Sequence, residues 1–146
     1  MQISSRFTIA LHIFACIDTF EDRYKITSEF LASSIQVNPV IIRKLLSQLR
    51  SAGLLEVQRG SGGASIAKAP EEITLLDIFR AVECVEGGEL FHFHENPNPA
   101  CPVGSSIHAV LDGRLEQIQS AMEREMEGIT LAEVLGDMRA RVAEGT

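Results

Sequence analysis

Apolar residues recur at helical spacing near the start of the chain and separate into short segments. The first segment follows a serine cap at Ser4 or Ser5. Its apolar positions are Phe7, Ala10, Leu11, Phe14 and Ile17. Thr27 is a good N-cap for a second helix that should run to about Ser34. The pattern therefore predicts two short helices that precede residue 36.

A third helix should start at Asn38-Pro39, because asparagine is a good N-cap and proline is well tolerated at the first helical position. Gly53 should end this helix as a left-handed cap. One face is apolar and the other is polar and basic. The apolar face consists of Ile42, Leu45, Leu46 and Leu49, and the outer face of Val40, Arg43, Lys44 and Ser47.

The pattern then changes from helical to strand-like. Residues 54–59 and 64–68 read as two strands. The residues between them, Gly60 to Gly63, form a glycine-rich turn. The sequence therefore predicts a β-hairpin directly after the third helix.

Helical spacing returns in the second half of the chain. Thr74, with Asp77 three residues later, opens a fourth helix with a capping box. Residues 89–104 hold three prolines and no clear period, which is typical of a loop. A second capping box at Thr130 opens a last short helix, and the tail after Asp137 should fray.

Between this loop and the last helix lies a long helix whose apolar seam is too long for the small elements before it to cover. Ser105 or Ser106 should cap its start. We expect the seam to pack against a second copy of the chain. The predicted dimer interface consists of Ile107, Leu111, Leu115, Ile118 and Met122.

Three short helices followed by a glycine-tipped hairpin are the order of a winged helix-turn-helix. We therefore predict a mainly α fold, with three helices plus a β-hairpin wing and a long C-terminal dimerisation helix. The predicted division is a winged helix-turn-helix DNA-binding domain over 1–69, a linker helix and sensor loop over 70–104, and a dimerisation helix with a C-terminal short helix over 105–146. A chain of 146 residues is too short for two full catalytic domains.

In this fold the third helix enters the major groove and the hairpin reaches the DNA backbone. The start of the third helix should meet base edges first, and its basic residues should lie along the groove wall. The predicted DNA-binding residues are Thr27, Ser28, Asn38, Pro39, Val40, Arg43, Lys44, Ser47, Gln48, Arg59, Ser61, Gly62, Gly63 and Ser65. The alternative is that Arg43, Lys44 and Arg59 merely solubilise the surface.

The charge distribution favours DNA binding although the whole chain has a net charge of −7. Residues 1–69 hold 8 Lys and Arg against 5 Asp and Glu, a net charge of +3, whereas residues 70–146 hold 5 against 15, a net charge of −10. Residues 30–55 contain three basic residues and no acid. An acidic protein can therefore present a local positive surface to DNA.

Several segments also resemble a known family. They are residues 3–12, 38–46, 51–55, 59–64, 73–78 and 129–135. Together they resemble the IscR, NsrR and CymR family of bacterial repressors, the Rrf-two family. The run from His94 to Gly104 looks like the YwnA-like branch, which lacks the three-cysteine cluster motif. The resemblance implies a homodimeric transcription regulator that binds a palindromic site in double-stranded DNA.

The predicted sensor loop departs from the family members that hold an iron–sulfur cluster, since these place three cysteines there and this chain has only Cys101. We therefore expect no cofactor, because cluster irons need several thiolate or imidazole ligands. Cys101 precedes the start of the long helix, where the helix dipole can lower a thiol pKa. It is a candidate redox sensor, and the alternative is that it packs as a small apolar side chain.

The histidines leave other sensor chemistries open. His12 lies in an apolar segment, so we expect it to be buried and hydrogen-bonded, with a sensor role beside His94 as the alternative. His92, His94, Cys101 and His108 offer ligands for a metal, a cluster or a small molecule, although their spacing fits no regular site. Which metal, if any, is unknown.

Other function classes find little support in the sequence. No nucleophile motif, P-loop or dinucleotide fingerprint occurs, so we expect no enzyme. No signal peptide or membrane segment is evident, so we expect a cytoplasmic protein that does not bind membranes. A protein-interaction adaptor that has lost DNA binding is the remaining alternative, and the effector is unknown.

Overall fold

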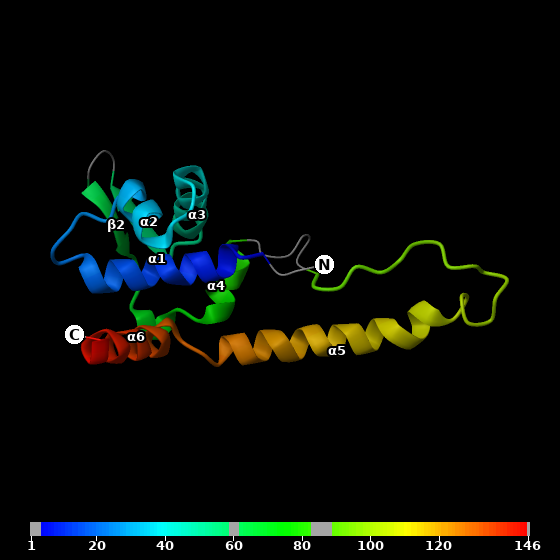
Figure 1. Ribbon diagram of the computed structural model, residues 1–146. Coiled ribbons are helices and arrows are strands. Elements are labelled where there is room, and N and C mark those ends of the chain that lie inside the picture. Colours follow the sequence, from blue (N-terminus) through cyan, green and yellow to red (C-terminus); the bar gives the residue numbers. More distant parts are fainter. Residues whose placement is uncertain (1–3, 59–61, 83–88, 146) are drawn as a thin grey trace.

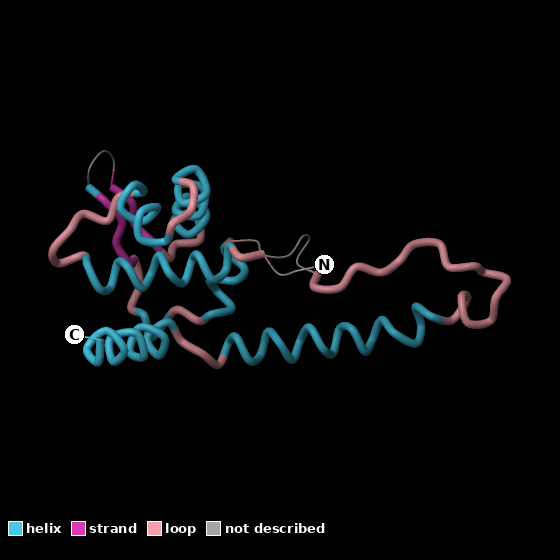
Figure 2. Tube along the Cα trace, viewed as in Figure 1, coloured by secondary structure: helices cyan, strands magenta, loops and turns pink. Residues whose placement is uncertain are grey.

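The computed structural model describes residues 4–58, 62–82 and 89–145. Helices dominate it, and the strands of the described residues form one antiparallel hairpin (Figures 1 and 2). The elements are α1 (Arg6–Phe20), α2 (Ser28–Ile35), α3 (Pro39–Ser51), β1 (Leu55–Gln58), β2 (Gly63–Ile66), the short 3-10 helix η2 (Pro70–Glu72), α4 (Leu75–Ala81), α5 (Ile107–Glu127) and α6 (Leu131–Gly145). The predicted winged helix-turn-helix with a long helix after it is confirmed.

Side-chain caps start α2, α3 and α4 as the sequence predicts, whereas the predicted serine caps of α1 and α5, Ser5 and Ser106, precede their helices without a capping hydrogen bond from the side chain. The Thr27 hydroxyl accepts the N–H of Phe30 at 3.1 Å, and the Asn38 side chain accepts the N–H of Val40 at 2.9 Å. Thr74 forms a complete capping box at the start of α4. Gly53 adopts a φ of +78° just after α3, a conformation that glycine reaches without strain. Local side-chain chemistry thus fixes where these helices begin and end.

The core lies on both sides of α1. Figure 1 shows α2, α3 and the hairpin on one side of this helix and α4 and α6 on the other. Ile13, Phe14 and Ile17 of α1 are fully buried between them. Phe7 packs edge to face on Phe79 of α4, with ring centroids 5.5 Å apart. The helices of the second half therefore complete the core of the DNA-binding unit.

His12 is exposed, so the expectation that it is buried is wrong. In a helix each residue turns by about 100°, which places position 12 opposite the buried face formed by Ala10, Ile13, Phe14 and Ile17. Cys16, one turn later, is buried and lies 3.3 Å from the hydroxyl of Ser34.

The C-terminal helix α6 is longer than the sequence predicts. The tail after Asp137 does not fray, because α6 continues to Gly145. Leu131 and Leu135 are fully buried in the core, and Arg139 donates two hydrogen bonds of 2.9 and 2.7 Å to the carboxylate of Asp18 in α1. This contact joins residues 121 positions apart, so the local pattern at the tail did not predict it.

The long helix α5 extends away from the body as an arm (Figure 1). Every residue of α5 is described, and none of them is buried. The loop that precedes α5 runs alongside it (Figure 2). The N–H of Leu90 donates to the side chain of Gln119 at 2.9 Å, and the ring of Phe93 stacks on His108 with centroids 3.7 Å apart. We call residues 89–106 together with α5 the arm.

Among the described residues, no helix has both the length and the hydropathy of a membrane span.

The role of α6 in the core can be tested with Leu135→Ala. We expect the free energy of unfolding to fall by about 2–5 kcal/mol, because the substitution leaves a cavity among fully buried side chains. Urea unfolding followed by circular dichroism measures the change. Val142→Ala, at a position 44% exposed on the same helix, is the matched control and should change the free energy by less than about 0.5 kcal/mol. Equal effects of the two substitutions would contradict the packing described.

Candidate nucleic-acid interface

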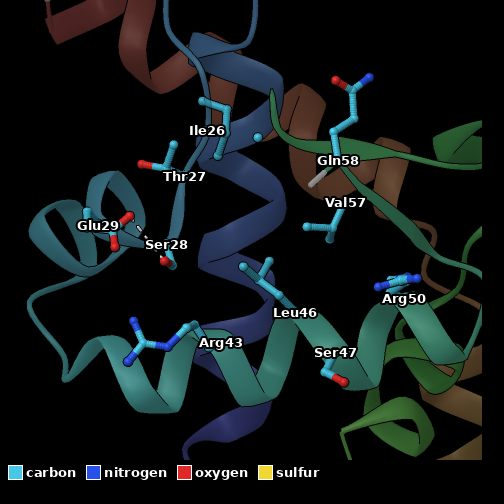
Figure 3. Close-up of a pocket in the computed structure, with 11 residues that line it drawn as sticks. Ile26, Thr27, Ser28, Glu29, Arg43, Leu46, Ser47, Arg50, Val57 and Gln58 are labelled. Atoms are coloured by element: carbon cyan, nitrogen blue, oxygen red, sulfur yellow. Dashed lines mark hydrogen bonds between the residues drawn. The ribbon is translucent and has the colours of Figure 1, made fainter. Parts of the chain in front are cut away.

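A groove of about 520 Å³ opens between the start of α2, the helix α3 and the hairpin (Figure 3). Leu46 and Val57 point into it from α3 and β1. Arg43 and Arg50 lie on α3 to either side of Leu46. The full lining is Ile26, Thr27, Ser28, Glu29, Arg43, Leu46, Ser47, Arg50, Val57, Gln58 and Gly63. The groove combines an apolar floor with two guanidinium groups at its rim.

The helix α3 has one buried apolar face and one exposed polar and basic face, as its sequence predicts. Ile42, Leu45 and Leu49 are fully buried beneath it. Its outer face is exposed and consists of Val40, Arg43, Lys44 and Ser47. This face spans two turns, so it can follow a phosphate backbone. The opposite face holds the helix on the core.

The predicted DNA-binding residues at the start of α3 are not equally available. The Asn38 side-chain oxygen is held by the N–H of Val40, which closes the helix cap. Pro39 is half-buried and has no N–H to donate. Gln48 is half-buried, and its side-chain oxygen has no hydrogen-bond partner among the described residues. Val40 is therefore the most open of the residues in the first turn, at 60% exposure.

The start of α2 brings polar groups to the same groove. Thr27 uses its hydroxyl on the N–H of Phe30, and the hydroxyl of Ser28 lies 3.2 Å from the carboxylate of Glu29. The N-terminal end of a helix favours an anion, because its first N–H groups lack partners within the helix. A phosphate is the anion that DNA would offer there.

Sequence reasoning missed two charged residues of this groove. Arg50 lies seven residues after Arg43, which places both on one side of α3 two turns apart. The seven-residue spacing from Arg43 is a signal in the sequence that identifies Arg50 as a candidate DNA-binding residue. Glu29 could not be identified in this way, since it comes from α2 and reaches the groove only through the fold.

Gly63 of the hairpin has a structural role, because it packs closely against the backbone before α2. Gly63 has a φ of +80°, and a Cβ there would lie 2.8 Å from the backbone nitrogen of Ile26. The next residue, Ala64, donates its N–H to the carbonyl of Ile26 at 2.9 Å. Gly63 thus lets the hairpin approach the segment before α2. Gly62 is exposed beside the hairpin tip and Ser65 is half-buried, while the predicted contacts Arg59 and Ser61 lie outside the described residues.

Cys101 lies in the arm near the start of α5 and is half-buried. Hydrogen bonds from the backbone N–H groups of Gly104 and Val103 to its sulfur lower the pKa of the thiol. These donors stabilise the thiolate, which is the reactive form of cysteine. A side chain at position 104 would collide with the carbonyl of Asn98, so Gly104 allows the tight turn that positions one donor.

The arm also brings aromatic rings and histidines together. Phe93 of the loop stacks on its neighbour His94, with centroids 4.8 Å apart, and on His108 in the first turn of α5. His108 lies 3.4 Å from the carboxylate of Asp112, and His92 and His94 are exposed. A second groove of about 600 Å³ lies here. It is lined by Glu89, Phe91, Phe93, His108, Asp112, Leu115, Glu116, Gln119, Ser120 and Glu123.

Comparison with known proteins gives three findings. The Rrf2 family model, described as an iron-dependent transcriptional regulator, matches residues 3–137. YwnA of Bacillus subtilis (strain 168), whose name places it among HTH-type transcriptional regulators, is 43% identical over 137 residues, which cover 94% of this chain and 99% of YwnA. A solved structure described as a DNA binding protein is 37% identical, with a TM-score of 0.70 over 90% of this chain and 99% of that one.

CymR, the global cysteine regulator of Bacillus subtilis, has a similar fold. Its structure gives a TM-score of 0.66 over 93% of this chain and 97% of CymR, at 22% identity.

The family description names iron, but the donor set of the arm does not fit an iron–sulfur cluster. Such a cluster needs several thiolate or imidazole ligands gathered around it. Cys101 is the one cysteine between residues 89 and 106. In the parts of the chain that the structure describes, no three His, Cys, Asp or Glu side chains gather as a metal site would require.

The thiol of Cys101 can be tested by its reaction with iodoacetamide. We expect its rate to reach half of its maximum at a lower pH in the folded protein than in urea, because the N–H donors of Gly104 and Val103 lower the pKa only in the fold. Mass spectrometry of the alkylated peptides separates this cysteine from Cys16, which is buried and should stay protected until unfolding. The same pH midpoint in both states would show that these donors do not act on the thiol.

Proposed function

The chain belongs to the Rrf2 family and is a DNA-binding transcriptional regulator, and we propose that it acts as a homodimeric repressor on a pseudo-palindromic operator. The groove between α2, α3 and the hairpin is the observation that supports this proposal most directly. It places two arginines and a helix N-terminus on one face of an otherwise acidic chain. Such a face suits the phosphates of DNA.

In the proposed complex α3 lies in the major groove of B-DNA. The helix has 13 residues and is about 20 Å long, and a major groove about 12 Å wide admits one helix. Val40 and the first turn enter first, while Arg43 and Arg50 lie against one phosphate backbone. The hairpin reaches the neighbouring backbone. This is the docking geometry of a winged helix-turn-helix.

The proposed dimer forms through α5. No side chain of this 21-residue helix is buried. In the predicted seam Ile118 is exposed, and Ile107, Leu111, Leu115 and Met122 are only half-buried, so a single chain does not bury the seam. Val110 and Ile118 are 61% and 52% exposed. A second copy of α5, related by a twofold axis, would cover the same seam on both chains. Two winged helices would then face two half-sites, and such a dimer bound at a promoter would block polymerase in the cytoplasm.

We further propose that the arm modulates DNA binding through Cys101. Attack of its thiolate on hydrogen peroxide would form a neutral sulfenic acid and release hydroxide, which removes the charge that the N–H groups of Gly104 and Val103 stabilise. The packing of the loop against α5 would change as a result. His92, His94, Cys101 and His108 do not gather as the ligands of a metal or a cluster would. A small ligand bound in the groove beside His108 is therefore the second candidate signal. Either signal would alter DNA binding by changing how α5 packs in the dimer.

The groove assignment predicts the effect of Arg43→Ala. Affinity for all duplexes should fall, and the slope of log K against log salt should become shallower by about one unit, because one phosphate contact is lost. Fluorescence anisotropy at several salt concentrations measures both. Arg141→Ala, an exposed arginine of α6, is the control and should leave the slope unchanged. Equal slopes for the two variants would show that Arg43 makes no phosphate contact. The absence of salt-dependent binding to any duplex would favour an adaptor that has lost DNA binding.

The dimer assignment predicts the effect of Leu111→Asp. A carboxylate in the middle of the seam should separate the chains, since burying an unpaired charge is strongly unfavourable. Size exclusion with light scattering should report a monomer of 16.0 kDa, and operator affinity should fall with it. Ala109→Asp adds the same charge at an exposed position on the other side of α5 and should leave the dimer intact. A Leu111→Asp dimer would place the interface elsewhere.

A further inference from the structure

The first turn of α3 exposes aliphatic side chains at a position where a recognition helix commonly has side chains that form hydrogen bonds with bases. Val40 is 60% exposed and Ile41 is 42% exposed, and both lie in the first turn of α3. Single exposed apolar residues need no explanation, but two in succession at the tip of a recognition helix do. The sequence predicts a DNA contact for Val40 without indicating its chemistry and predicts none for Ile41.

The polar groups near this turn are not available to recognise bases by hydrogen bonds. An asparagine that recognises adenine uses its oxygen and its nitrogen together, and the Asn38 oxygen is occupied by the N–H of Val40 at 2.9 Å. Pro39 has neither a donor nor a polar side chain. The first turn therefore reaches the bases with aliphatic side chains.

Helix geometry places Val40 at the centre of the DNA-facing surface. Arg43, Lys44 and Ser47 follow Val40 by three, four and seven residues, so all four share one face. Ile41 lies about 100° around the helix from Val40, beside Lys44. Val40 therefore lies between Arg43 and Lys44, which can position the helix on phosphates, and Ile41 lies on the far side of Lys44.

In the major groove only thymine presents an apolar group, the C5 methyl. We propose that Val40 and Ile41 are specificity-determining residues that recognise thymine methyl groups in each operator half-site. This inference rests on the proposed function and adds the chemical class of base that the recognition helix selects. It predicts A·T pairs at the positions that face the start of α3, chosen by contact with a methyl group and not by a hydrogen bond.

The test replaces thymine with uracil, which differs only by that methyl. A duplex selected from a random-sequence pool by this protein is resynthesised with uracil at one thymine position at a time. Binding is measured by fluorescence anisotropy at constant salt. We expect one or two positions in each half-site at which uracil weakens binding about fourfold, the factor that corresponds to one buried methyl group.

The protein variants decide whether Val40 and Ile41 cause that loss. In Val40→Ala the fourfold loss should disappear at one thymine position, and in Ile41→Ala at its neighbour, as a double-mutant cycle requires for direct contact. Both positions are exposed, and alanine favours a helix, so circular dichroism should show both variants folded. Val142→Ala, in α6, is the control and should retain both losses.

The possible failures are distinguishable. If uracil is tolerated at every position while the selected duplex still binds, this inference is overturned and the proposed function stands. The same holds if the losses persist in the Val40→Ala, Ile41→Ala double variant, because they would then report DNA shape. If no duplex is selected at all, both the proposed function and this inference are overturned.

Discussion

Two backbone hydrogen bonds hold the base of the arm to the body of the protein. The N–H of Leu75 donates to the carbonyl of Ile129 at 2.9 Å, and the N–H of Leu131 donates to the carbonyl of Ile73 at 2.7 Å. They form an isolated antiparallel bridge centred on Thr74 and Thr130. Each of these threonines also starts a helix with its capping box. The direction of α4, α5 and α6 is therefore set at one small junction.

This junction separates two kinds of apolar surface. On the body side, Ile73 and Leu131 are fully buried and join the core around α1. On the arm side, the loop stacks along α5 and the seam of this helix is half-buried at most, with Ile118 exposed. A second chain that covers the seam would be placed relative to α3 by the same junction. The spacing of two recognition helices on DNA would then depend on a contact that lies more than twenty residues after the end of α3 in each chain.

Local chemistry explains which parts of the fold could be predicted from the sequence. The caps at Thr27, Asn38 and Thr74 act on neighbours within three residues, and the structure contains all three as predicted. The outer face of α3 followed from helical spacing alone. The length of α6 could not be predicted, because the salt bridge between Arg139 and Asp18 depends on the tertiary fold.

The candidate interface was predictable in kind but not in detail. The spacing of basic residues pointed to α3, yet the groove also takes Glu29 from α2 and Gln58 from the hairpin. Gly63 was assigned to phosphate contact because glycines allow close approach. The structure instead shows its close approach to the backbone of Ile26. The burial of His12 was misjudged because an apolar neighbourhood in sequence does not tell which side of a helix faces the core.

The central claim is that two winged helices, joined through α5, face two half-sites on one side of the DNA. Hydroxyl-radical footprinting of a selected duplex tests it most directly, since it reads backbone protection at single-nucleotide resolution. We expect two equivalent protected patches whose centres lie about one helical turn, or slightly more, apart on the same face. One continuous patch without twofold symmetry would contradict the account.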